Sequence, residues 1–92
     1  MTVADSIRRK LSEGFAPEAL SVTDESAYHA GHAGARPGGE THFNVRIVSA
    51  RFQGVSRVER QRQIYAALAA EFAAGLHALS LKALTPEEAG KD

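Results

Sequence analysis

The chain has 92 residues and no cysteine, and its eleven Lys and Arg residues balance eleven Asp and Glu residues to a formal net charge of +0. This balance excludes a general attraction of the whole chain to nucleic acid or anionic membranes, and the lack of cysteine excludes disulfides, thiolate metal ligands from this chain and a cysteine nucleophile. No apolar run approaches the roughly 20 residues of a membrane span and the first dozen residues have a helical pattern, so we expect one cytoplasmic domain over residues 1–92, without membrane contact.

The first part of the chain predicts one helix followed by one short strand. Thr2 and Asp5 have the spacing of a capping box, and apolar residues then recur one turn apart up to Gly14, where we expect the helix to end. Apolar and polar residues alternate from Leu20 to Glu25, which predicts a strand with one face toward the core.

Residues 27–40, with the sequence AYHAGHAGARPGGE, show no apolar periodicity and predict a long loop that carries His29 and His32. Connections between antiparallel neighbours usually have about 2–5 residues, so the length of this loop calls for an explanation. Long loops in small domains are often functional or mobile. The alternative interpretation is a flexible insertion without a function.

The clearest alternation in the chain follows this loop. Phe43, Val45 and Ile47 fall on one face of a half-buried strand. A short segment and a glycine turn come next, and Ser56 can then cap a helix that runs to about Ala74. A strand that feeds a helix of this length is half of a right-handed βαβ crossover.

This long helix has one apolar stripe when its residues are projected at about 100° per residue. The stripe contains Val58, Ile64, Tyr65, Leu68 and Phe72. Gln61 projects into the middle of the stripe, so it is either satisfied by a hydrogen bond at the sheet edge or marks a place where function overrides packing. We expect Gly75 to end the helix as a C-cap.

Residues 76–84 predict a last strand, parallel to the strand before the long helix, with His77 on the same side as Leu79 and Leu81. Thr85 and Pro86 begin a final helical turn, so residues 85–92 form a C-terminal turn and tail. The predicted fold class is α/β, with the order α-β-β-α-α-β of a class II KH-like domain. It is expected to have a three-stranded mixed sheet with its helices packed on one face.

The histidines are the side chains with a plausible joint role. No hydrolase elbow, P-loop or dinucleotide fingerprint is present, so we expect no enzyme. The two parallel strands start at one edge of the sheet, close to the end of the long loop, and His77 can therefore meet His29 or His32. Imidazole suits zinc, copper, iron and nickel, but a complete site needs about four ligands. This pattern favours an open, incomplete metal site; the alternative is a solvated loop pair and a structural histidine at the strand end.

Nucleic-acid binding is the rival function. Residues 46–62 contain five arginines and one acid, and Arg46, Arg57, Arg60 and Arg62 are the candidate contacts. The alternative is a solvated helix face on which arginine stems cover apolar surface. KH domains grip the nucleic-acid backbone with a GXXG loop, whereas this segment has Gly54 as its single glycine, which weakens a KH-type grip.

Several short motifs occur together in a specific order. They are Asp24-Glu25-Ser26 with His29, Thr41-His42-Phe43, Val48-Ser49, Phe52-x-Gly54, Arg60-x-Arg62, and His77-Ala78-Leu79 with Thr85-Pro86. In these motifs and their spacing, from about residue 7 to residue 88, the chain resembles the BolA family.

The resemblance implies a KH-like fold and a non-enzymatic partner of monothiol glutaredoxins, with a [2Fe-2S] cluster that bridges the two proteins. The iron ligand on the family's C-terminal strand matches His77, and the ligand from the long loop matches His29. The partner's cysteine and its glutathione complete the ligand set. The loop is longer here than expected for the family, so His32 can replace His29.

Imidazole in place of thiolate raises the reduction potential of such a cluster, which suits iron sensing or regulated cluster transfer. The family often has Arg-His-Arg where this chain has Arg60-Gln61-Arg62, so a role of that middle histidine does not carry over. Some members are described as DNA-binding transcriptional regulators, which keeps the basic segment as a rival site.

Overall fold

The computed structural model describes residues 2–24, 42–76 and 78–91, and it begins with helix α1 (Val3–Phe15). The predicted capping box is present: the Asp5 backbone N–H donates to the Thr2 hydroxyl, and the Thr2 N–H donates to the Asp5 carboxylate, each at 3.1 Å. The helix runs past Gly14, where it was expected to end. Ala16 closes it instead, in a left-handed conformation with φ of 43°.

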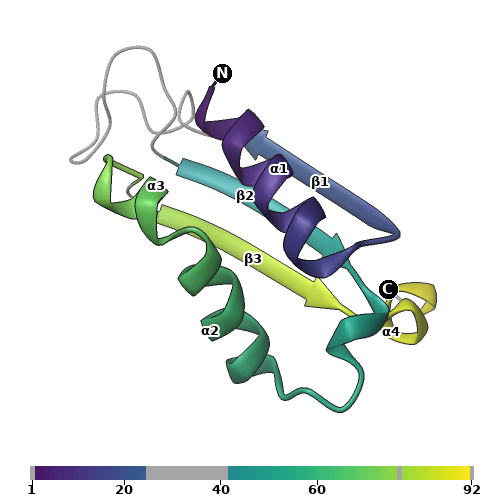
Figure 1. Ribbon diagram of the computed structural model, residues 1–92. Helices are drawn as coiled ribbons and strands as arrows, with labels where there is room; N and C mark the ends of the chain where they lie inside the picture. Colours follow the sequence, from purple (N-terminus) through teal and green to yellow (C-terminus); the bar gives the residue numbers. More distant parts are fainter. Residues whose placement is uncertain (1, 25–41, 77, 92) are drawn as a thin grey trace.

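Three strands form one mixed sheet in the order β1-β2-β3 (Figure 1). Strand β1 (Ala19–Asp24) pairs antiparallel with β2 (His42–Val48), and β2 pairs parallel with β3 (Ala78–Leu84). This confirms the predicted sheet. The remaining elements are η2 (Ala50–Phe52), α2 (Arg57–Ala67), α3 (Ala69–Ala73) and α4 (Pro86–Gly90).

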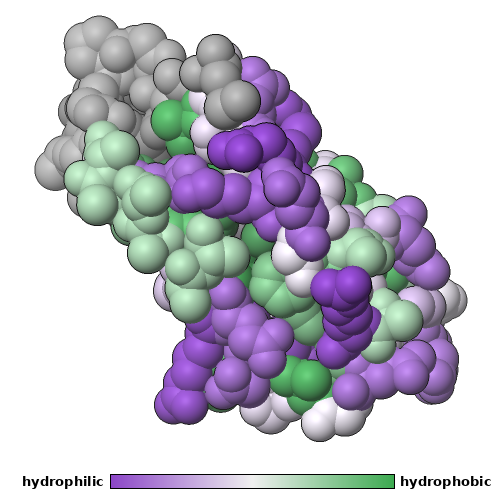
Figure 2. Space-filling model, viewed as in Figure 1, coloured by the Kyte–Doolittle hydropathy of each residue, from purple (hydrophilic) through white to green (hydrophobic). Residues whose placement is uncertain are grey.

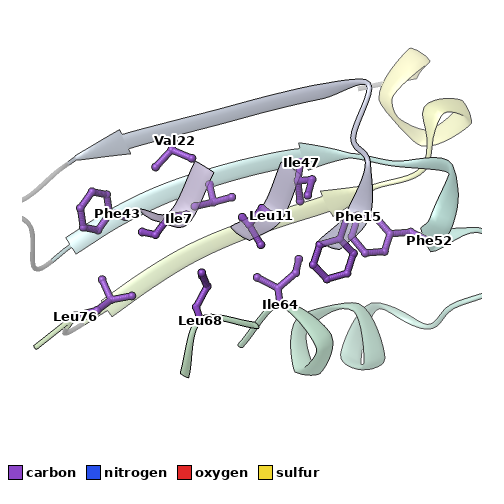
Figure 3. Packing of buried hydrophobic residues seen from close by; sticks show 11 residues of the cluster. Ile7, Leu11, Phe15, Val22, Phe43, Ile47, Phe52, Ile64, Leu68 and Leu76 are labelled. Carbon is purple, nitrogen blue, oxygen red and sulfur yellow. The ribbon is translucent and has the colours of Figure 1, made fainter. Parts of the chain in front are cut away.

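The core lies between the sheet and helices α1, α2 and α3, which pack on the same sheet face, as predicted. Its buried members, which Figure 3 shows as sticks, are Ile7, Leu11, Phe15, Val22, Phe43, Val45, Ile47, Phe52, Ile64, Leu68 and Leu76. Burial of each large apolar side chain stabilises the fold by about 1.5–3 kcal/mol. Within the three described ranges, no helix is long and apolar enough to cross a bilayer.

The buried face of α2 lies to one side of the predicted apolar stripe. Ile64 and Leu68 are fully buried, as predicted. Val58, however, is 61% exposed, so its predicted place in the core is wrong. Gln61 is exposed as well, and its side-chain amide donates to the Tyr65 hydroxyl at 3.2 Å.

Two charged side chains occupy the core-facing positions instead. Arg60 is 6% exposed and Glu71 is 9% exposed. Glu71 accepts a hydrogen bond from Lys10 of α1 at 2.9 Å, and Arg60 is paired with Glu88 of α4 at 2.6 Å. Buried charges are tolerated only with such partners, and both partners are distant in sequence. Local periodicity therefore could not identify this face.

The helical segment predicted as one helix is interrupted at Leu68, which has φ of −103° and ψ of 17°. It ends in a Schellman turn: the Gly75 N–H donates to the Phe72 carbonyl at 3.3 Å, and the Leu76 N–H donates to the Glu71 carbonyl at 3.0 Å. Gly75 has φ of 124°, which L-residues rarely adopt. This turn confirms Gly75 as the cap and directs the chain into β3.

The turn gives a test of the fold. Replacing Gly75 by alanine should destabilise the protein by about 1 kcal/mol, because alanine is strained at this φ. Gly14→Ala is the matched control, since Gly14 lies within α1 and nothing is within 4 Å of an added Cβ; it should be neutral or slightly stabilising. Urea unfolding followed by far-UV circular dichroism measures both. Equal midpoints for the two variants would contradict the turn geometry.

Candidate functional site

The described residues next to the predicted metal ligands converge at one end of the sheet. Asp24 ends β1 opposite Phe43, at the end of the sheet where His42 begins β2. His42 is in turn opposite Ala78, the first residue of β3. The chain therefore leaves β1 and enters both β2 and β3 at the same end of the sheet, next to the N-terminus of α1 (Figure 1).

The packing of the crossover fixes the point at which the chain enters β3. Leu76, in the turn after Gly75, is only 5% exposed and belongs to the core cluster. Two positions later, Ala78 is already paired with His42 in the parallel ladder. Leu76 and Ala78 are thus both fixed by the fold, one by the core and the other by the ladder.

The predicted ligands His29, His32 and His77 lie outside the described residues, so their role remains a prediction. Among the residues the structure describes, no three His, Cys, Asp or Glu side chains gather as a metal site. A [2Fe-2S] cluster takes four ligands, which are usually cysteine thiolates or histidine imidazoles. A chain without cysteine can offer only the imidazoles.

The four arginines predicted to bind nucleic acid do not form one surface. Arg57 and Arg62 are exposed on α2, with side-chain exposures of 74% and 75%. Arg46 lies between the core residues Val45 and Ile47 in β2, so it belongs to the sheet face opposite the helices. A duplex that contacts α2 would therefore not reach Arg46 on the same surface.

Arg60 is an internal residue, which corrects its assignment to a nucleic-acid surface. Its Nε donates to the Val55 carbonyl at 2.8 Å, and its Nη1 donates to the Ala83 carbonyl at 3.0 Å and to Glu88 at 2.6 Å. Its guanidinium carbon lies 5.8 Å from the centre of the Phe52 ring. A phosphate could reach this side chain only by displacing these contacts.

The Arg60–Glu88 pair ties α4 to the crossover. The Thr85 backbone N–H donates to Glu88 at 2.8 Å, and the Glu88 N–H donates to the Thr85 hydroxyl at 3.2 Å, so the predicted C-terminal capping box is present. The hydrogen bond from Arg60, followed by the one from the Thr85 backbone, lowers the pKa of Glu88 to about 2. The acid that caps α4 is thus also the partner of the buried arginine, which the capping motif alone does not reveal.

Comparison with known proteins points to one family. Residues 11–88 match the family model described as BolA-like protein. BolA-like protein 1 of Pongo abelii is 46% identical over 90 residues, which is 98% of this chain and 63% of that protein. The SufE-like protein 1, chloroplastic/mitochondrial, of Arabidopsis thaliana is 54% identical over 86 residues, which is 89% of this chain and 23% of that protein. This chain therefore spans less than two thirds of either relative.

A bacterial relative carries a functional name. The DNA-binding transcriptional regulator BolA of Vibrio cholerae is 41% identical over 86 residues, covering 94% of this chain and 77% of that protein. Since other relatives are named for chloroplasts or mitochondria, the cytoplasmic location expected from the sequence stays a prediction.

Solved structures share the fold over nearly the whole chain. The BolA domain of SufE1 from Arabidopsis thaliana has a TM-score of 0.83 at 52% identity and covers 92% of this chain and 93% of that one. BolA1 from Arabidopsis thaliana has a TM-score of 0.84 at 39% identity, with 96% of both chains covered. The element order and the sheet are therefore those of these proteins.

The Glu88 ion pair predicts how stability changes with pH. The pKa of Glu88 falls from an ordinary 4.5 to about 2 on folding, so its stabilisation is complete above pH 4.5 and is lost as the pH falls toward 2. Glu88→Gln should flatten the curve of unfolding free energy against pH in this window. Part of the slope should persist, because hydrogen bonds from Thr2 also lower the pKa of Asp5.

Urea titrations at a series of pH values between 2 and 7 measure this slope. Glu87→Gln, which removes an exposed carboxylate from the same short helix, controls for the loss of one charge. An unchanged slope in Glu88→Gln, with a normal fold by circular dichroism, would show that the pair does not couple to folding.

Proposed function

Because this chain belongs to the BolA-like protein family, we propose that it is a non-enzymatic adaptor in iron-sulfur or iron homeostasis that binds a monothiol glutaredoxin and shares a [2Fe-2S] cluster with it. The observation that carries this proposal is the convergence of Asp24, His42 and Ala78 at one end of the sheet. These residues flank the two histidine-bearing parts of the chain, which are far apart in sequence.

His77 would supply one imidazole, and His29 or His32 the second. The remaining two ligands would be the cysteine of the glutaredoxin and its glutathione, because this chain has no thiolate to offer. When bound, the cluster would provide one-electron redox chemistry at a potential raised by its imidazole ligands.

This chain would contribute imidazole ligands that bind the cluster and release it when they are protonated. A histidine binds metal only in its neutral form, so cluster binding should weaken as the pH falls below the ordinary histidine pKa of about 6.5.

Anaerobic reconstitution tests the role of His77. The apo protein is mixed with a monothiol glutaredoxin, glutathione, ferrous iron and sulfide, and visible circular dichroism follows the bridging cluster. Wild type should give a spectrum distinct from that of the glutaredoxin alone, and His77→Ala should lose most of it. His42→Ala is the matched control, because His42 begins β2 at the same end of the sheet and should leave the spectrum in place. A wild-type spectrum from His77→Ala would exclude His77 as a ligand.

The same assay assigns the second ligand. Loss of the spectrum in only one of His29→Ala and His32→Ala identifies that histidine. If each single variant retains the cluster and the double variant loses it, either histidine can serve. A double variant with the wild-type spectrum would exclude both.

A DNA-binding regulator is the second candidate function. The name of the Vibrio cholerae relative and the exposure of Arg57 and Arg62 on α2 favour it. Arg60 is not a DNA contact in this candidate function, because it is buried in its ion pair with Glu88. The contacts would be electrostatic, made to phosphates by side chains on one helix.

Duplex affinity measured by fluorescence anisotropy at several salt concentrations tests this candidate. Arg57→Ala and Arg62→Ala should each weaken binding similarly for all sequences and reduce the slope of log K against log salt by about 1. Arg46→Ala should change neither value, since Arg46 lies on the opposite sheet face. A wild-type Kd weaker than about 10⁻⁴ M at physiological salt would contradict DNA binding.

A further inference from the structure

A groove separates α2 from the outer edge of β3. It has a volume of about 160 Å³ and is lined by Arg57, Gln61, Leu81, Lys82 and Ala83. Strand β3 is the last strand in the sheet order, so the edge that faces this groove has no neighbouring strand in the described sheet. Sheet edges present N–H and C=O groups that can pair with another chain.

The hydrogen bonds of β3 show which backbone groups face the groove. The Ser49 N–H donates to the Leu84 carbonyl at 2.9 Å, so Leu84 faces β2. Backbone direction alternates along a strand, so Leu79, Leu81 and Ala83 face outward. The Tyr65 hydroxyl lies 3.5 Å from the Leu79 carbonyl, in agreement with this alternation.

Side chains of α2 contact the outward-facing carbonyls of β3 on both sides of Leu81. Tyr65 contacts the carbonyl of Leu79, and Arg60 donates to the carbonyl of Ala83 at 3.0 Å. Between them, the N–H and C=O of Leu81 open onto the groove. The edge is therefore available over one residue, which is too short for a long added strand but sufficient for one bridge.

The rim of the groove favours an anionic occupant. Arg57 is 74% exposed, and Glu88, the acid 3.8 Å from it, is already held by Arg60 at 2.6 Å. Lys82 pairs with Arg46 in the ladder, so its side chain belongs to the opposite sheet face and Arg57 supplies the positive charge at the rim. Figure 2 shows hydrophilic residues over the N-terminal part of α2, in contrast with the weakly hydrophobic surface over α3.

We propose that this groove binds an extended acidic peptide segment of a partner protein, through one antiparallel bridge to Leu81 and a carboxylate placed near Arg57. In an antiparallel hydrogen-bonded pair, two residues exchange both of their bonds, so one peptide residue satisfies the N–H and the C=O of Leu81. None of the described residues that line this surface is a histidine.

A nucleic-acid strand suits the groove less well than a peptide. Among the residues that the structure describes, those that line the groove include no aromatic ring on which a base could stack. The nearby Tyr65 ring packs against Phe72, with centroids 5.3 Å apart, and its hydroxyl contacts Leu79. A peptide needs main-chain partners and one charge complement, and the groove offers both.

Amide hydrogen exchange in the free protein tests the open edge. The Leu81 amide should exchange at least about tenfold faster than those of Ser80 and Lys82, which face β2 in the ladder. Equal protection of the three amides would show that the Leu81 edge is closed and would overturn the proposal.

Selection of short random peptides against the metal-free 92-residue chain tests the occupant. The retained peptides should be acidic, and their titration into ¹⁵N-labelled protein should shift the Leu81 amide. Charge reversal by Arg57→Glu should weaken binding at least about tenfold, and so should N-methylation of the peptide residue that bridges Leu81. His77→Ala should bind as wild type does, so this result is independent of the cluster proposal.

Gln61→Phe should obstruct the groove and abolish binding, whereas Gln63→Phe, also at an exposed position of α2, should not. Both variants are checked for wild-type circular dichroism before use. Failure to retain any peptide, retention of peptides without acidic residues, or binding that survives Gln61→Phe would each overturn the proposal. A single-stranded DNA oligonucleotide that shifts the Leu81 amide at lower concentration than the peptides would also overturn it and assign the groove to nucleic acid.

Discussion

The parallel pairing of β2 with β3 is the constraint on which the rest of the structure depends. Parallel neighbours cannot be joined by a hairpin, so the chain must cross back along the sheet, and α2 and α3 make that crossing. The pairing brings His42 and Ala78 together at one end of the sheet. It also places α2 beside the outer edge of β3. The proposed cluster end and the proposed peptide groove are two consequences of the same topology.

Buried ion pairs then determine how the crossover is rotated against the sheet. The apolar stripe alone predicts an orientation of α2 in which Val58 and Gln61 face the core. The pairing of Arg60 with Glu88, and of Glu71 with Lys10, turns α2 and α3 so that these charges face the core. Buried pairs of this kind contribute little net stability, because the cost of taking both charges out of water offsets their attraction. We infer that these two pairs select the observed rotation over the alternative one. Their effect here is to leave Gln61 on the groove.

Local patterns predicted the parts of this fold that local interactions determine. The alternation of β2 and the capping boxes at Thr2 and Thr85 depend on residues within one turn or one strand. The burial of Arg60 depends on Glu88, which is 28 residues away in the sequence, so hydrophobic periodicity could not predict it. For the metal site, the sequence predicted that the strand ends next to the histidine-bearing segments meet at one end of the sheet, and the structure shows this for Asp24, His42 and Ala78. The predicted ligands themselves lie outside the described residues.

Both candidate surfaces on β3 are chemically incomplete: the end at Ala78 lacks sulfur ligands, and the edge at Leu81 lacks a hydrogen-bonding partner. The end at Ala78 adjoins histidine-bearing segments in a chain that has no thiolate, so a cluster there requires sulfur from another molecule. The edge at Leu81 presents one donor and one acceptor between carbonyls closed by Tyr65 and Arg60, so it can pair with a short segment and cannot extend the sheet. A single strand carries both positions, and the packing of α2 against β3 limits what can pair at Leu81.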